Sequence, residues 1–159
     1  MLSDSPVCDF RFLGRGWLLK RDDLLDPELN GNKARKLYTF AANGLGEDTV
    51  ISYGGAQSNA MYSLSALAKK QNAEFIYYAK KLPDTLRHNP DGNLAAALEN
   101  GMKLVELEHK AYDETISNLL NNQPEGAILI RQGGADEYAK EGVRMLADEL
   151  KEYAKSHAL

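Results

Sequence analysis

Short apolar runs alternate with longer segments of helical spacing over most of the chain. Apolar runs rich in β-branched and aromatic residues predict four strands, at residues 49–52, 75–78, 103–107 and 127–130. The segments that follow these runs predict four helices, at residues 58–71, 91–99, 112–121 and 135–153. Strands separated by helices are typical of βαβ units. The sequence therefore predicts an α/β fold with an open parallel sheet of about four strands and helices on both faces.

The N-terminal part of the chain shows a different pattern. Residues 10–13 and 17–20 are apolar-rich and flank the glycine-containing segment 14–16, which predicts a hairpin. Residues 22–32 are polar and include proline and glycine, which predicts a loop. Residues 33–43 carry apolar side chains at helical spacing, so one helix is expected there.

Two glycine turns follow predicted strands, GGAQSN at residues 54–59 and QGG at residues 132–134. Open parallel sheets bind ligands beyond the carboxyl ends of their strands, so we expect a cleft where these turns meet. Free N–H groups at the start of the next helix attract anions. Ser58 at that start either faces such an anion or only caps the helix. Asp91 is expected to cap the helix at 91–99.

Lys33 is the candidate nucleophile. It stands at the expected start of a helix, after the flexible Gly31. The positive end of a helix disfavours the ammonium form and lowers the pKa of the amine, which favours attack on an aldehyde. A solvated surface charge is the alternative interpretation of this lysine. Arg35 and Lys36 follow on the same helix and face either a phosphate or water.

Composition narrows the classes of partner. The 159 residues carry a formal net charge of −4 and no basic patch, so nucleic acid is not expected as a partner. No apolar run approaches the roughly 20 residues of a membrane span, so no membrane is expected either. Cys8 is the single cysteine, which fits a reducing cytoplasm. His88, His109 and His157 lack the spacing of metal ligands, so no metal site is expected.

The ordered set of motifs resembles a known family. GNKARKL at 31–37 and GGAQSN at 54–59 are similar to the motifs of pyridoxal-phosphate enzymes of the tryptophan-synthase-β fold, also called fold type II. The 1-aminocyclopropane-1-carboxylate deaminase and D-cysteine desulfhydrase family is the most similar group. KRDDL at 20–24 and GNL at 92–94 resemble further segments of that family.

The resemblance implies a role for each candidate residue. Lys33 would hold pyridoxal phosphate as a Schiff base, and Ser58 would lie near the substrate for proton transfer or carboxylate contact. Asn59 would contact the ring oxygen of the cofactor, and Lys36 would lie near its phosphate. The implied reaction acts on a small amino acid by β-elimination or ring opening and releases ammonia.

The resemblance further implies that the chain is the N-terminal half of such an enzyme. Residues 1–45 would form the N-terminal edge of a large domain, residues 46–132 a small parallel α/β domain, and residues 133–159 a helix leading back to the large domain. We therefore expect an incomplete two-domain fold. The isolated chain is expected to be inactive and to form a homodimer or pair with a second half.

Two interpretations without this activity remain open. A four-stranded domain of this kind could act as a non-catalytic interaction module or be a degenerate remnant. A flavodoxin-like domain could instead bind a phosphorylated ligand at the two glycine turns. Both predict properties that do not depend on Lys33, whereas the enzyme interpretation requires it.

Overall fold

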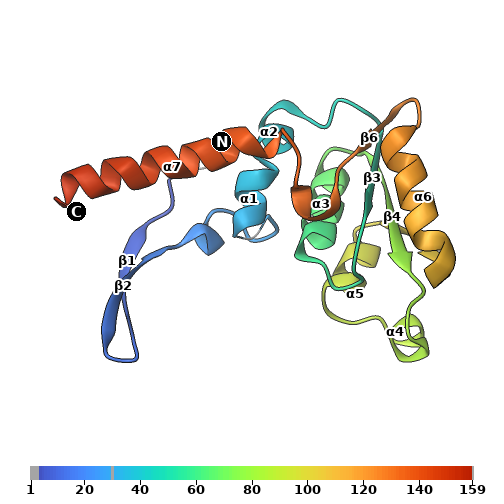
Figure 1. The fold of residues 1–159 in the computed structure, drawn as a ribbon, viewed down its shortest axis with the longest axis horizontal. Coiled ribbons are helices and arrows are strands. Elements are labelled where there is room, and N and C mark those ends of the chain that lie inside the picture. Colours follow the sequence, from blue (N-terminus) through green and yellow to red (C-terminus); the bar gives the residue numbers. More distant parts are fainter. Residues whose placement is uncertain (1–3, 30, 159) are drawn as a thin grey trace.

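A parallel sheet with its helices forms one end of the elongated molecule, and a hairpin beside a long helix forms the other (Figure 1). The computed structural model describes residues 4–29 and 31–158. The sheet has four strands, which are β3 (Thr49–Tyr53), β4 (Glu74–Lys80), β5 (Lys103–Leu107) and β6 (Ala127–Leu129). The predicted α/β class, the parallel sheet and the N-terminal hairpin are thus confirmed.

The strand order of the sheet is β5-β4-β3-β6, and all neighbours run parallel. The chain moves outward from β3 through β4 to β5 and then crosses back to place β6 on the other side of β3. Strand order therefore reverses between β3 and β6. In an open sheet, a crevice forms outside the carboxyl ends of the strands at such a reversal.

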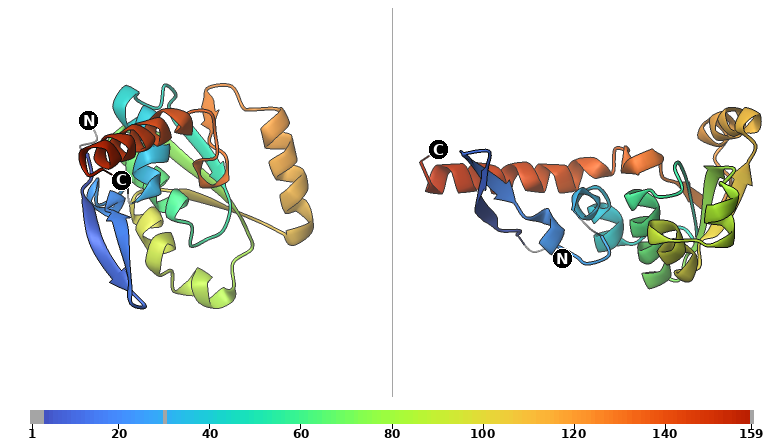
Figure 2. Two further views of the ribbon diagram at one scale, coloured as in Figure 1. Left: turned by 60° about the vertical axis from the view of Figure 1, so that its left-hand side comes forward. Right: turned by 90° about the horizontal axis from the view of Figure 1, so that it is seen from below.

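Helices cover both faces of the sheet, as Figures 1 and 2 show. The helices α3 (Asn59–Lys70) and α5 (Gly92–Glu99) pack together on one face, and α6 (His109–Asn121) covers the other. The core between the sheet and α3 contains the fully buried Val50, Met61, Leu64, Phe75, Tyr77 and Leu94. Burial of each large apolar side chain contributes about 1.5–3 kcal/mol, which holds this layer together.

The hairpin consists of β1 (Val7–Phe12) and β2 (Arg15–Lys20). Its turn residues Leu13 and Gly14 have φ angles of 49° and 74°. Two residues with positive φ form the tight turn that matches the twist of a hairpin. The sequence placed the turn at residues 14–16, which is wrong because Leu13 adopts the left-handed conformation and residues 15 and 16 pair within the ladder.

The single helix expected at 33–43 is instead two short helices, α1 (Asn32–Lys36) and α2 (Tyr38–Asn43). Leu37, with a ψ angle of 7°, breaks the helix between them. Its side chain is buried in the core, and leucine itself favours helix, so local propensity does not account for the break. The loop expected at 22–32 contains a 3₁₀ turn, η1 (Asp22–Leu24), and the first residue of α1.

The connections before α5 and α7 also differ from the prediction. The helix α4 (Asp84–His88) lies in the connection before α5 and was not predicted. After β6 the chain forms a 3₁₀ turn, η2 (Gln132–Gly134), and the last helix, α7 (Ala139–Ser156), starts four residues later than the predicted residue 135. The Asp136 carboxylate accepts a hydrogen bond from the Arg131 N–H at 2.8 Å, which holds this segment as a turn.

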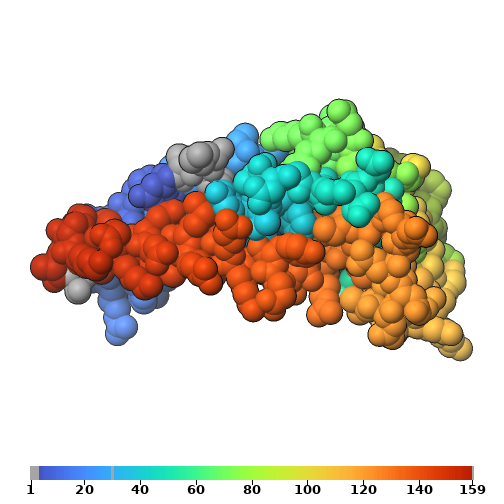
Figure 3. All heavy atoms as spheres, turned by 90° about the horizontal axis from the view of Figure 1, so that it is seen from above, coloured from blue at the N-terminus to red at the C-terminus, as the bar shows by residue number. Residues whose placement is uncertain are grey.

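The long helix α7 crosses back over α1 and α2, and Figure 3 shows it on the same face as α2. A Cβ atom at Gly142 would lie 1.9 Å from the Arg35 carbonyl oxygen, so only glycine permits this approach. Phe40 and Tyr138 add an aromatic contact with ring centroids 4.8 Å apart. Among the described residues, no helix combines the length and the apolar character that a membrane crossing requires.

A buried ion-pair cluster fixes α1 against α7. The Arg35 guanidinium, 1% exposed, donates to both carboxylate oxygens of Glu149 at 2.6 Å and to Asp22 Oδ1 at 2.9 Å. Lys20 Nζ lies 2.7 Å from Glu149, and Ser5 Oγ donates to Asp22 at 2.6 Å. The sequence led us to expect Arg35 to face a phosphate or water, and this is wrong because two carboxylates enclose it.

The cluster keeps Arg35 and Asp22 charged. Burial alone would lower the pKa of Arg35, but the hydrogen bonds that it donates to Glu149 and Asp22 outweigh burial and raise that pKa. Burial likewise works to raise the pKa of Asp22, and the hydrogen bonds from Arg35 and Ser5 lower it overall. A buried guanidinium without its partners is costly, so α7 must stay in place on α1.

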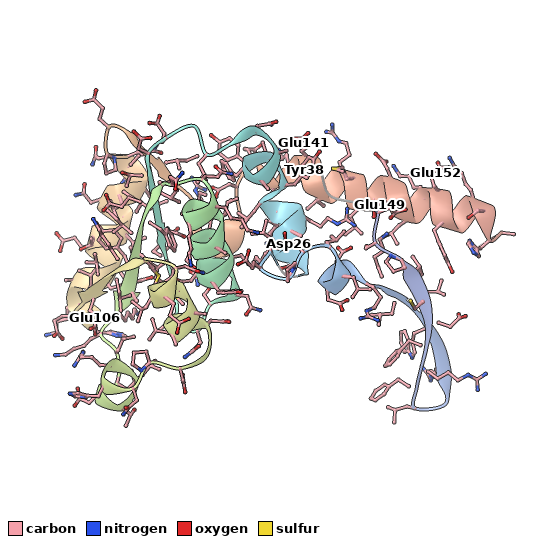
Figure 4. The ribbon with its side chains drawn as sticks, turned by 180° about the vertical axis from the view of Figure 1, so that it is seen from behind. Asp26, Tyr38, Glu106, Glu141, Glu149 and Glu152 are labelled. Atoms are coloured by element: carbon pink, nitrogen blue, oxygen red, sulfur yellow. The ribbon has the colours of Figure 1, made fainter. Side chains whose placement is uncertain are left out.

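Substitution Glu149→Gln should lower the free energy of unfolding by about 2–4 kcal/mol, because it leaves part of the Arg35 charge uncompensated. Urea denaturation at neutral pH measures this loss. Glu152→Gln, one turn further along α7 and paired with Lys155 at the surface, is the matched control (Figure 4). It should cost less than about 0.5 kcal/mol. Equal denaturation midpoints for the two variants would contradict a supporting role for the cluster.

Candidate active site

The two glycine turns touch each other at the reversal of strand order. Gly54 follows β3 with a φ angle of 145°, and a Cβ atom there would lie 2.7 Å from Tyr77 Oη and 3.2 Å from Gln132 Cγ. Gln132 begins the turn that follows β6. The first turn can therefore lie against the second only because Gly54 has no side chain. The expected meeting of the two turns at one edge is present.

Lys33 and Lys36 converge on the second turn. Their Nζ atoms donate to the same carbonyl oxygen, that of Gly133, at 3.3 and 3.2 Å. A Cβ atom at Gly134 would lie 3.5 Å from Lys36 Cβ, so α1 packs directly on this turn. Both lysines are half-buried. The structure thus brings Lys33 and Lys36 to the edge of the sheet where the strand order reverses.

The amine of Lys33 is more easily deprotonated than a solvated lysine. Burial, and then the positive charge of Lys36, lower its pKa. We expected a lowered pKa from the positive end of a helix, but α1 has only five residues. Burial and the neighbouring ammonium group are the physical causes here. A larger fraction of free amine makes Lys33 a better nucleophile toward a carbonyl carbon.

Ser58 caps the helix α3. Its hydroxyl accepts hydrogen bonds from the N–H groups of Ala60 and Met61 at 3.2 and 3.4 Å. Tyr77 lies close by and donates from its hydroxyl to the Gly55 carbonyl at 3.1 Å. Burial raises the pKa of the Tyr77 phenol, which therefore remains a donor near neutral pH. Ser58 therefore caps the helix, as one of its two interpretations predicted. This half-buried residue lies directly after the first glycine turn.

Asn59 is hydrogen-bonded to the start of α5. Its Oδ1 accepts a hydrogen bond from Asn93 Nδ2 at 2.7 Å. Gln57 continues this link, because its Nε2 donates to the Asp91 carboxylate at 2.9 Å and its Oε1 accepts from the Asn93 N–H at 3.0 Å. Asp91 occupies the cap position of α5 but makes no side-chain capping bond, so the expected cap is wrong.

The candidate residues thus form two neighbouring groups. Lys33 and Lys36 reach the second turn, while Ser58 and Asn59 follow the first, and the turns join through Gly54 and Gln132. Sequence reasoning missed Tyr77 and the Gln57 to Asn93 link, since neither has a local pattern. Within residues 4–29 and 31–158, no group of three or more histidine, cysteine or acidic side chains is placed to hold a metal ion.

Solved structures share this arrangement of elements. An ACC deaminase homologue matches 94% of the chain with a TM-score of 0.73 and 25% identity, over 48% of its own length. The T.th. threonine deaminase matches 99% of the chain, with a TM-score of 0.66 and 18% identity, over 48% of its length. The Escherichia coli diaminopropionate ammonia lyase matches 99%, with a TM-score of 0.60 and 15% identity, over 49% of its length.

The chain has the fold of the pyridoxal-phosphate enzymes of fold type II. It spans about half the length of these structures. No family model matches the chain. The likeness to fold type II extends to the order and packing of the elements, whereas the roles of Lys33, Lys36, Ser58 and Asn59 stay predictions.

Gly54→Ala should lower the free energy of unfolding by about 1–3 kcal/mol, because the added Cβ meets Tyr77 and Gln132 at a φ angle that disfavours a side chain. Thermal or urea denaturation measures the loss. Gly55→Ala is the matched control, since a Cβ there meets nothing within 4 Å. A Gly54→Ala variant as stable as the control would show that the turns do not need this contact.

The positive charge of Lys36 lowers the pKa of Lys33. Lys33 should therefore be acylated at a lower pH than it would be without that charge. Limiting acetic anhydride with mass spectrometry gives the reaction rate at Lys33 as a function of pH. In Lys36→Met, the loss of the nearby positive charge should raise the pKa of Lys33 and move its profile to higher pH. Lys69→Met, on α3, should leave the profile in place. Identical profiles in all three proteins would contradict the charge coupling.

Proposed function

We propose that the chain is the N-terminal portion of a pyridoxal-phosphate-dependent enzyme that acts on a small amino acid. The proposed reaction is deamination or desulfhydration, by β-elimination or ring opening with release of ammonia. One observation supports this proposal most strongly. Lys33 donates to the Gly133 carbonyl at the edge of the sheet where the strand order reverses and the two glycine turns meet. The fold shared with an ACC deaminase homologue, a threonine deaminase and a diaminopropionate ammonia lyase supports the reaction class.

The residues at this edge fit the proposed cofactor. The half-buried Lys33 amine, with its lowered pKa, would bind the aldehyde carbon of pyridoxal phosphate. Lys36 adds a positive charge beside it, suited to an anionic phosphate. The exposed Asn59 amide would contact a polar substituent of the ring. When bound, the cofactor supplies an electron sink for the carbon that carries the amino group.

The protein groups supply orientation and proton handling in this proposal. The backbone N–H groups after the first turn and the Ser58 hydroxyl would orient the substrate carboxylate. Ser58, whose hydroxyl already accepts two backbone hydrogen bonds, would hold or pass a proton near the reacting carbon. Gly54 and Gly55 let a ligand approach the backbone without a side chain between them.

A second part of the proposal concerns the incomplete fold. Residues 1–45 and 133–159 would belong to a large domain and residues 46–132 to a small one, as the packing of α7 on α1 and α2 supports. The hairpin exposes the apolar side chains Phe10, Phe12, Leu13, Trp17, Leu18 and Leu19. Such a surface supports pairing with a second half or with a second copy of the chain. The chain alone would have little activity.

Pyridoxal phosphate added to the purified chain, followed by borohydride and peptide mapping, should attach the cofactor mainly to Lys33. The lowered pKa and the position of this amine favour it over surface lysines. The Lys33→Ala variant should lose most of the label, while Lys69→Ala, on the exposed end of α3, should keep it. A non-catalytic module or a flavodoxin-like domain predicts label spread over exposed lysines and unaffected by Lys33→Ala, and that result would refute the proposal.

A further inference from the structure

A hollow of about 290 Å³ opens at the carboxyl edge of the sheet, beside the first glycine turn. We call it the Lys80 pocket. Its lining residues are Gly54, Gly55, Ala56, Lys80, Tyr112 and Gln132. They come from the turn after β3, the end of β4, the helix α6 and the start of the turn after β6. The pocket therefore lies at the same edge of the sheet as the candidate site.

The pocket shares a wall with the lysine group. Gln132 lines it, and the next residue, Gly133, carries the carbonyl oxygen that accepts from Lys33 Nζ. Gln132 also lies against Gly54, because a Cβ atom at Gly54 would be 3.2 Å from Gln132 Cγ. A molecule held at Lys33 would thus have the Lys80 pocket as its neighbour across a single turn of backbone.

The pocket carries one positive charge and no negative charge on its lining. Lys80 Nζ lies 5.1 Å from the centre of the Tyr112 ring, a cation–π contact. In the described part of the chain, no carboxylate forms a salt bridge with Lys80. The adjacent Lys81 differs, because its Nζ pairs with the Glu108 carboxylate at 2.8 Å. The Gln132 amide and the Tyr112 hydroxyl are the other polar side-chain groups of the lining.

We propose that the Lys80 pocket binds an anionic group on the side chain of the substrate amino acid. This inference rests on the proposed function and narrows its substrate class to amino acids whose side chain ends in a carboxylate or another small anion. Lys80 would pair with that anion, and Gln132 and Tyr112 would donate hydrogen bonds to it. Glycines on the facing wall leave room for the group to enter.

A neutral substrate fits this pocket less well. The Lys80 side chain is already half-buried, and a bound ligand would remove more water from its ammonium group. A neutral ligand group does not compensate the free-energy cost of this desolvation, whereas an anion offsets that cost by pairing with the ammonium group. The pocket should therefore discriminate by charge more than by shape.

L-Aspartate and L-asparagine test this, because they share a shape and differ in side-chain charge. Each is titrated into the purified chain without cofactor, and the amide NMR signals of Gly54, Gly55 and Lys80 are followed. We expect aspartate to bind at least about tenfold more tightly than asparagine. The Lys80→Gln variant should lose this preference, while Lys81→Gln, the matched neighbour with its own partner, should keep it.

Each remaining outcome would overturn the inference. These are equal affinity for the two amino acids, a preference that survives Lys80→Gln, or a preference lost equally in Lys81→Gln. If the same NMR signals show that inorganic phosphate binds more tightly than aspartate, the pocket is a phosphate site instead. The titration contains no cofactor, so its failure is separate from a failure to label Lys33.

Discussion

The burial of one guanidinium group constrains the whole arrangement of the candidate site. Arg35 is almost fully removed from water, so it requires carboxylates, and these come from Asp22 before it and Glu149 far beyond it. Lys33 and Lys36 flank Arg35 and are one helical turn apart, so they share a face. With Arg35 held toward α7, that face is turned to Gly133. The direction of the candidate nucleophile thus follows from an ion pair that does no chemistry.

Positive charge gathers at this edge of an acidic chain. The chain carries a net charge of −4, yet Lys33, Lys36 and Lys80 all lie near the two glycine turns. Lys33 and Lys36 donate to a single backbone carbonyl, and among the described residues no carboxylate forms a salt bridge with either amine. The positively charged amines at this edge attract anions. A cofactor with a phosphate and a substrate with a carboxylate are ligands of that kind.

Local patterns in the sequence were enough to predict the four strands, the parallel sheet and the hairpin. The strand at 103–107 has the same bounds in sequence and structure, because its apolar run and flanking glycine are local signals. The break at Leu37, the burial of Arg35 and the pairing of Gln57 with Asp91 and Asn93 had no such signal. Each depends on residues that are distant in sequence, and only the folded chain brings them together. Lys33 was found through its motif, but the cause of its lowered pKa lies in packing.

The long separation between Arg35 and Glu149 has a consequence for the order of folding. The two residues are 114 positions apart, whereas each βαβ unit of the sheet closes over a much shorter span. During synthesis the sheet can assemble while α7 is still inside the ribosome. Until α7 emerges, Asp22 pairs with the Arg35 guanidinium, but α1 lacks the Glu149 carboxylate and the close approach of Gly142. The contact between Arg35 and Glu149, which fixes the orientation of α1, therefore forms only when α7 packs on α1.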